Sequence, residues 1–253
     1  MIKKITLFIS IFCLLGGSAN SQVSIKDSSI FMTVFYATYS YQFPQGDLSV
    51  LFGSNSSVGG GILFKTKSNL LFGAEGNFLF GGTVKNGDSL LKGVSTPAGF
   101  VIDANGYYAD INYLERGYSI YGKVGGIISV LAPNPNSGIT IMAGGGYFQD
   151  KIRIHNPGNT ARQINGDYKK GYDRLNSGYA INGSIGFTYF SNSRLINFYA
   201  GLEFIQSWTK NQREYFFDTQ KYENINYSTQ FYGFKIKWMI PLYKRSPKEF
   251  YLY

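Results

Sequence analysis

Cysteine, histidine and long apolar runs are almost missing from this sequence. The single cysteine is Cys13, and the single histidine is His155. A chain with so few of these residues has no disulfide framework and no ligand set for a zinc site. No segment beyond the N-terminal region holds eighteen consecutive apolar residues, which excludes membrane crossing by helices. We expect no metal and no cofactor.

The N-terminal region is typical of a secretory signal peptide. A short cationic start, Met1–Lys4, precedes the apolar run Ile5–Leu15, and small residues then lead to Gln22. We expect cleavage after Ser21. Cys13 lies inside the apolar run rather than after it, so we interpret it as part of the signal and not as a site of lipid attachment.

The remaining composition is rich in glycine and aromatic residues. The sequence has 31 glycines, 21 tyrosines and 21 phenylalanines, and its mean hydropathy is near neutral at −0.11. A membrane barrel that alternates apolar and polar residues has such an average. A net charge of +9 also suits nucleic-acid binding. Because the chain is exported in this interpretation, we instead expect anionic lipid or lipopolysaccharide as the counter-charge, and no nucleic acid.

Apolar and polar residues alternate with period two along eight segments, which predicts β-strands. In the last segment, Phe234, Ile236 and Trp238 alternate with Lys235 and Lys237. The four clearest segments are Leu70–Gly82, Gly178–Phe190, Leu195–Trp208 and Tyr227–Ile240. The four weaker ones are Ile30–Phe43, Ser57–Thr66, Tyr118–Val130 and Gly138–Phe148. Most have about ten to fourteen residues, enough to cross a bilayer at a tilt, whereas globular strands average about five or six.

Short and long connections alternate between these strands. The short ones are residues 67–69, 131–137 and 191–194, and the long polar ones are residues 44–56, 83–117, 148–177 and 209–226. Outer-membrane barrels have short periplasmic turns and long outer loops. The sequence therefore predicts an all-β, transmembrane, antiparallel up-and-down barrel of about eight strands, or ten if Phe100–Asn112 forms its own hairpin. The predicted organisation is a signal peptide over residues 1–21, an outer-membrane β-barrel over 22–243 and a periplasmic tail over 244–253.

Charged residues occur on the face of the strands that should point into the barrel. They are Glu75, Glu203, Lys123, Lys235 and Lys237, with Lys65 near a turn. An eight-stranded barrel is just filled by side chains, and buried charges there must be paired. We therefore predict a charge network in the lumen. It serves either as structural filling or as a narrow path for ions or protons.

Two further segments are candidates for contacts with a partner or with a phosphate-bearing lipid. In the third outer loop the candidates are Lys169, Lys170, Tyr172, Asp173 and Arg174. In the C-terminal tail they are Lys244, Arg245 and Tyr253. Because Pro241 and Pro247 lack an N–H group, we expect them to interrupt the last strand before the tail.

His155 is the one residue that could act in acid–base catalysis with an acidic partner. We expect it in the third outer loop, without a nearby serine. Barrels of the lipid A deacylase type are similar in size, but they use a triad of serine, histidine and an acidic residue. We therefore expect no catalytic residues in this chain.

Several segments resemble small outer-membrane barrels of the OmpX and OmpW type, and most closely barrels common in the Bacteroidota. The matching features are the start at Gln22, the segments Lys170–Arg174 and Ile196–Gly201, and the ending Ile240–Arg245. The resemblance implies an outer-membrane location and includes accessory subunits of envelope machines, such as those of type IX secretion or barrel assembly. We therefore expect a non-enzymatic structural or interaction role. A small channel and a lipid A-modifying enzyme are the alternatives.

Overall fold

The computed structural model describes residues 28–192, 196–222 and 225–243, and within them eight long strands close into one antiparallel barrel. The strands are β1 (Met32–Gly46), β2 (Asn55–Lys65), β3 (Leu70–Gly81), β4 (Asn112–Ile128), β5 (Gly138–His155), β6 (Asn176–Phe190), β7 (Asn197–Asn211) and β10 (Asn226–Tyr243). Each pairs with its neighbours in this order, and β10 pairs with β1 to close the sheet. The predicted fold, a small barrel of outer-membrane type, is confirmed.

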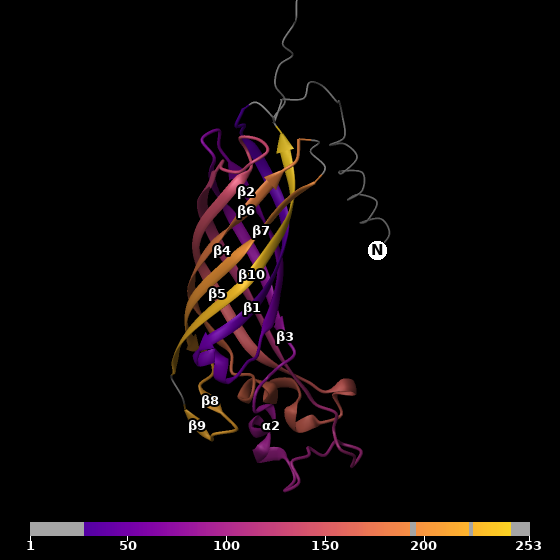
Figure 1. Cartoon of the computed structure of the whole chain (residues 1–253). Coiled ribbons are helices and arrows are strands. Elements are labelled where there is room, and N and C mark those ends of the chain that lie inside the picture. Colours follow the sequence, from indigo (N-terminus) through magenta and orange to yellow (C-terminus); the bar gives the residue numbers. More distant parts are fainter. Residues whose placement is uncertain (1–27, 193–195, 223–224, 244–253) are drawn as a thin grey trace, which may run out of the picture.

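The two ends of the barrel differ, as Figure 1 shows. At one end, here called the turn end, short connections join β2 to β3, β4 to β5 and β6 to β7. At the other end, the loop end, four long loops gather. They contain the helical turns η1 (Asp47–Val50), α2 (Gly87–Leu90), η2 (Lys92–Val94), η3 (Pro157–Asn159), η4 (Arg162–Ile164) and η5 (Gly166–Gly171) and the short strands β8 (Tyr215–Phe216) and β9 (Lys221–Tyr222).

The barrel has eight strands, so the alternative of ten strands is wrong. Phe100–Asn112 contributes a single bridge, between Ile102 and Tyr108, outside the barrel sheet. The pair β8–β9 forms a separate two-stranded sheet within the last long loop. The chain between β3 and β4 is polar and bends repeatedly, so it does not supply the long alternating run that a barrel strand requires.

Three strands are markedly longer than the sequence pattern predicts. β4 has 17 residues, and β5 and β10 have 18 each. β4 and β5 pair continuously from Asn112 and His155 at the loop end to Ile128 and Ile139 at the turn end. His155 is therefore the last residue of β5. The expectation from the sequence, which placed His155 within the third outer loop, is wrong.

Pro241 does not interrupt β10, contrary to the expectation from the sequence. It lies opposite Val34 in the β1–β10 ladder. The ladder between β10 and β7 has already ended at Trp238 and Phe198. Because β10 has only one neighbour at this point, the missing N–H group of proline costs no ladder hydrogen bond on the open side.

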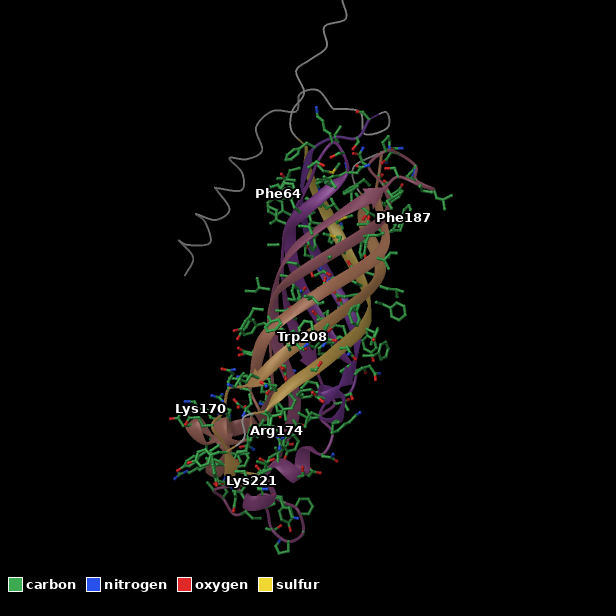
Figure 2. All side chains as sticks on the ribbon, turned by 90° about the vertical axis from the view of Figure 1, so that its left-hand side faces the viewer. Phe64, Lys170, Arg174, Phe187, Trp208 and Lys221 are labelled. Atoms are coloured by element: carbon green, nitrogen blue, oxygen red, sulfur yellow. The ribbon has the colours of Figure 1, made fainter. Side chains whose placement is uncertain are left out.

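The outside of the barrel wall is apolar. The predicted alternation holds: Phe72, Ile236 and Trp238 are exposed on the wall, whereas Lys235 and Lys237 are buried inside. Figure 2 shows aromatic rings on the wall near the turn end, among them Phe64 and Phe187. A contiguous apolar surface of this extent is favourable in contact with lipid and unfavourable in contact with water. The wall is that of a barrel that spans a membrane, as outer-membrane barrels do.

Glycines allow the close approach of neighbouring strands. Gly146 in β5 is the clearest example, because a Cβ atom at this position would lie 1.9 Å from the carbonyl oxygen of Ile120 in β4. The glycine-rich segment 59–61 of β2 pairs with residues 75–77 of β3, and the segment 144–146 of β5 pairs with residues 121–123 of β4. Glycines at such positions suit a tightly curved wall. None of the helices within the described residues is long and apolar enough to cross a membrane.

Candidate functional site: the lumen and the loop cap

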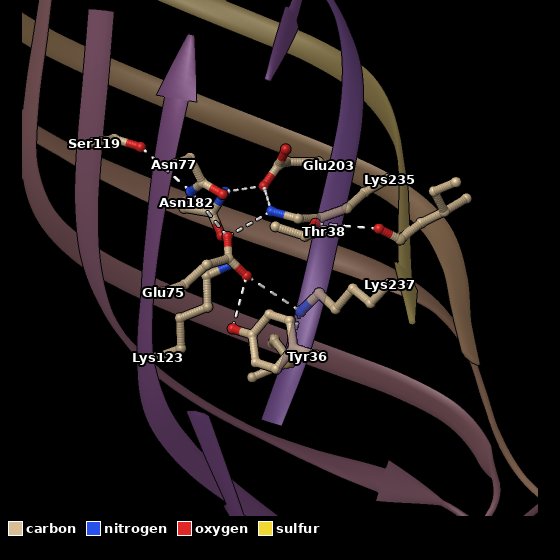
Figure 3. Close-up of polar contacts among 12 residues, drawn as sticks. Tyr36, Thr38, Glu75, Asn77, Ser119, Lys123, Asn182, Glu203, Lys235 and Lys237 are labelled. Atoms are coloured by element: carbon tan, nitrogen blue, oxygen red, sulfur yellow. Dashed lines mark hydrogen bonds and ion pairs between the residues drawn. The ribbon is translucent and has the colours of Figure 1, made fainter. Parts of the chain in front are cut away.

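The middle of the lumen holds an ionic network built from four strands. Glu75 comes from β3 and Glu203 from β7, and Lys235 of β10 joins them (Figure 3). The Nζ atom of Lys235 lies 2.6 Å from Oε1 of Glu75 and 2.5 Å from Oε1 of Glu203. Each of the three residues is at most 4% exposed. Lysine and glutamate are almost never buried to this degree unless they are paired.

Two further lysines approach Glu75. Nζ of Lys123 lies 3.1 Å from Oε1 of Glu75, at an angle that makes an ion pair but no hydrogen bond. Nζ of Lys237 lies 3.4 Å from Oε2 of Glu75, and 4.7 Å and 5.1 Å from the ring centres of Tyr36 and Tyr199. The structure therefore brings together all five charged residues that the sequence placed in the lumen. The three lysines outnumber the two glutamates, and the tyrosine rings add cation–π stabilisation.

Neutral side chains satisfy the remaining carboxylate positions. The hydroxyl of Tyr36 donates to Oε2 of Glu75 at 2.9 Å. The amide groups of Gln42 and Asn182 donate to Glu203 at 3.1 Å and 2.6 Å. A buried ionic group is tolerated when hydrogen bonds complete its coordination in this way. The network is therefore a close-packed plug in the middle of the barrel.

An apolar layer fills the lumen between this plug and the turn end. Its members include Met32, Val34, Leu63, Leu71, Ile127, Met142, Phe190, Tyr199 and Met239. The cavity among these side chains measures only about 10 Å³, room for one water molecule. Lys65 closes the end itself. Its Nζ donates to the carbonyl oxygen of Ile30 at 3.2 Å and to Oδ1 of Asn136 at 2.8 Å.

A second pair of carboxylates lies on the loop-end side of the network, and the sequence analysis missed it. Glu115 in β4 and Asp150 in β5 are both fully buried. Nδ2 of Asn55 lies 3.1 Å from each carboxylate oxygen of Glu115, and Nδ2 of Asn176 lies 3.2 Å from Oδ2 of Asp150. The signal was present in the sequence, because the alternation of β4 continues backwards through Ser119 to Glu115.

The long loops pack together into one unit, here called the cap (residues 47–54, 82–111, 156–175, 212–222 and 225). One apolar cluster runs without a break from the lumen into the cap. Its lumen members include Phe148, Ile205 and Phe231, and its cap members include Leu48, Phe52, Leu90, Leu91, Val101, Ala161, Ile164 and Tyr172. The cap is therefore an extension of the barrel core and not a set of independent loops.

Two ion pairs join the third and fourth long loops. Nε of Arg213 donates to Oδ1 of Asp173 at 2.8 Å, and a second contact makes the pair bidentate. Hydrogen bonding to Asp173 raises the pKa of Arg213 above its ordinary value. Arg174 pairs with Asp218 and lies over the ring of Phe216. Figure 2 labels Arg174 at the loop end, in the same region as Lys170 and Lys221.

These contacts divide the third-loop candidates from the sequence analysis into buried residues and exposed residues. Tyr172 and Asp173 are buried, and Arg174 is half-buried in its ion pair. Lys170 is exposed and pairs with Asp167 at 2.7 Å, and Lys169 beside it is half-buried. The other candidates, Lys244, Arg245 and Tyr253, lie outside the described residues. Lys170 is therefore the exposed residue among these third-loop candidates, whereas Tyr172, Asp173 and Arg174 hold the cap together.

The cap also exposes large aromatic side chains. Tyr107 is 73% exposed, Tyr168 62% and Tyr222 81%, and Tyr108 lies beside Tyr107. They come from three different loops and lie beyond the membrane-spanning wall, where lipid does not cover them. Exposed tyrosines are a compositional feature of protein interfaces.

His155 is exposed at the loop end of β5, opposite Asn112. Within the described residues no hydrogen bond or ion pair joins it to a carboxylate. Across the same residues no three histidine, cysteine, aspartate or glutamate side chains gather as metal ligands.

Comparison with known proteins finds no matching family model and no matching curated protein. Among solved structures, the attachment invasion locus protein Ail of Yersinia pestis is 10% identical, covers 83% of this chain and 99% of its own, and has a TM-score of 0.44. Neisserial surface protein A is 10% identical over 81% of this chain and 96% of its own, with a TM-score of 0.43. OprG of Pseudomonas aeruginosa is 10% identical over 88% of this chain and all of its own, with a TM-score of 0.34. Similarities of this size concern barrel architecture and say nothing about role.

Proposed function

We propose that this protein is a non-enzymatic interaction barrel of the outer membrane, which uses its wall as an anchor and its cap as the contact surface. The main observation in support of this proposal is the filled lumen beneath a packed cap. Charged, apolar and polar layers occupy the barrel from the turn end to the loop end. Such an interior supports anchoring and leaves little room for transport.

The orientation follows from the class of fold. In outer-membrane barrels the short turns face the periplasm and the long loops face outward. The cap then lies on the outer surface, and its exposed tyrosines, Tyr107, Tyr108, Tyr168 and Tyr222, are available to a partner there. We extend the proposal to membership of a larger envelope complex, such as one of type IX secretion or barrel assembly, because the sequence resembles accessory barrels of that kind.

The test is cross-linking and purification of the tagged protein from its native membrane in mild detergent. Replacement of Tyr107, Tyr168 and Tyr222 by serine should release partners that the unchanged protein retains. A matched control replaces Phe72, Phe234 and Trp238 on the wall by leucine, which keeps the apolar surface and should leave partners bound. Heat-dependent gel mobility reports that each barrel is folded. Equal recovery of partners with both sets of substitutions would refute a contact role for the cap.

A further inference from the structure

A pocket opens in the cap where three long loops meet. Its volume is about 590 Å³, and it is lined by Val94, Arg162, Gln163, Tyr168, Tyr172 and Phe217. Val94 belongs to the loop between β3 and β4, Phe217 to the loop between β7 and β10, and the others to the loop between β5 and β6. Sites that bind a small molecule have this size and commonly form between structural units.

Backbone and side-chain contacts hold the lining in place. The backbone N–H of Phe217 donates to the carbonyl oxygen of Gly171 at 3.0 Å. A side chain on Gly171 would collide with the Phe217 ring, since a Cβ atom there would lie 2.3 Å from it. Nε2 of Gln163 donates to the carbonyl oxygen of Ile102 at 2.7 Å. The ion pairs of Asp173 with Arg213 and of Arg174 with Asp218 fix the loops on either side. The pocket is therefore formed before any ligand arrives.

The charge in the lining is positive. Arg162 is the one ionic side chain among the six lining residues, and it is exposed. The nearby carboxylates of Asp167, Asp173 and Asp218 are paired with Lys170, Arg213 and Arg174. Arginine recognises carboxylate and phosphate through two parallel hydrogen bonds.

The apolar part of the lining is aromatic. Tyr168 is 62% exposed and Phe217 37%, so both offer ring surface to a ligand, while Tyr172 lies buried behind them against Phe217. Flat aromatic surfaces favour the apolar face of a ring, and the side-chain amide of Gln163 has a carbonyl oxygen left to accept from a hydroxyl group. A pyranose ring carries an apolar face, hydroxyl groups at its edge and, in uronic acids and sugar phosphates, one anionic group.

We propose that this pocket binds an acidic sugar residue, with the aromatic rings against the sugar face and Arg162 against its carboxylate or phosphate. The inference rests on the proposed function, because it names the chemistry of one partner of the cap. Two sources present this chemistry at the outer surface: the sugar chain of lipopolysaccharide in the same membrane and a free acidic polysaccharide.

The test measures binding to the full protein in lipid nanodiscs by titration calorimetry. The probes are a tetramer of galacturonic acid and a tetramer of galactose, which differ in their carboxylates. The acidic tetramer should bind at least about tenfold more tightly, and Arg162→Gln should remove that advantage. Tyr168→Ala should weaken the binding of both tetramers. Lys221→Gln, which removes an exposed charge of the same sign elsewhere in the cap, should change neither.

Purified lipopolysaccharide added as competitor separates the two sources. Displacement of the acidic tetramer assigns the site to the lipid-linked sugar, and no displacement assigns it to a free polysaccharide. Equal affinity for the two tetramers, or unchanged affinity in Arg162→Gln, would overturn the proposal. The partner-recovery experiment with the serine substitutions is read separately, so failure of the sugar site is distinguishable from failure of the cap as a contact surface.

Discussion

The lumen and the cap use charged side chains in opposite ways. In the lumen, the side chains of Glu75 and Lys235 are at most 1% exposed and belong to one network across the barrel. On the cap surface, Lys170 and Asp167 form an isolated pair whose side chains are 60% and 92% exposed. Charges buried in the lumen carry a large desolvation cost, which their mutual pairing and the hydrogen bonds from neutral side chains offset, whereas exposed charges are screened by water. In the proposed role, the lumen network fills and closes the barrel, and the cap charges contribute to a contact surface.

The largest expected effect follows removal of the central carboxylate. Glu75→Gln keeps the side-chain shape but leaves three lysines facing a neutral amide. We expect the free energy of unfolding to fall by about 3–5 kcal/mol, the cost of breaking a buried ion pair from one side. Urea unfolding in detergent micelles, followed by tryptophan fluorescence, measures it. Glu214→Gln in the exposed cap is the matched control, and an equal loss from both substitutions would erase the contrast between the two regions.

A smaller loss of unfolding free energy is expected when Lys65 is replaced at the turn end of the lumen. Lys65→Met retains the apolar stem but leaves the carbonyl oxygen of Ile30 and Oδ1 of Asn136 without this donor. Loss of a charged donor in a buried site costs about 2 kcal/mol. Hydrogen exchange at the backbone N–H of Ile30, which donates to Oδ1 of Asn136 at 3.0 Å, should accelerate. Lys67→Met in the adjacent turn, where the side chain is exposed, serves as the control. Unchanged exchange in Lys65→Met would mean that Lys65 does not close the barrel.

The sequence predicted the barrel well because its signal is local. Period-two alternation gave all eight strands, and the same alternation identified which charges point inward, from Glu75 on β3 to Lys237 on β10. The alternation predicted β4 and β5 to be too short, because Arg116 and Arg153 occupy outward positions beyond the apolar band. Those two strands continue above the membrane-facing wall, where an outward arginine is tolerated. Glu115 and Asp150 were missed for that reason.

The cap could not be predicted in the same way. Its core joins residues from loops far apart in the chain, such as Leu48, Val101 and Ile164, and no local period marks them. Asp173 and Arg174 stood out as an unusual charged segment, but their partners, Arg213 and Asp218, lie in another loop. Pro241 was misjudged because a strand with one open side is recognised only when the ladder register is known.

Within the cap, an effect confined to the loops is expected when the bidentate pair is removed. Arg213→Gln breaks the contact with Asp173 and should loosen the third loop against the fourth, at a local cost of about 1–2 kcal/mol. Limited proteolysis at residues 156–175 should become several-fold faster, while the unfolding of the barrel in urea keeps its midpoint. Lys210→Gln, at the exposed end of β7, should alter neither. A lower midpoint in Arg213→Gln would show that cap and barrel unfold as one.

The smallest effect is expected on the cap surface. Lys170→Gln removes the partner of Asp167 where both side chains face water. We expect no measurable change in the unfolding midpoint and none in the rate of loop cleavage. A clear loss of stability would contradict this expectation, because it would show that the exposed pair of Lys170 and Asp167 stabilises the protein as much as a buried ion pair does.

Single-channel recording in planar lipid bilayers tests the central claim, that the lumen is filled and closed to ions. The account predicts no steady conductance steps from the purified folded protein. Steady steps whose size changes in Glu203→Gln would contradict it, because ions would then be passing through the charge network.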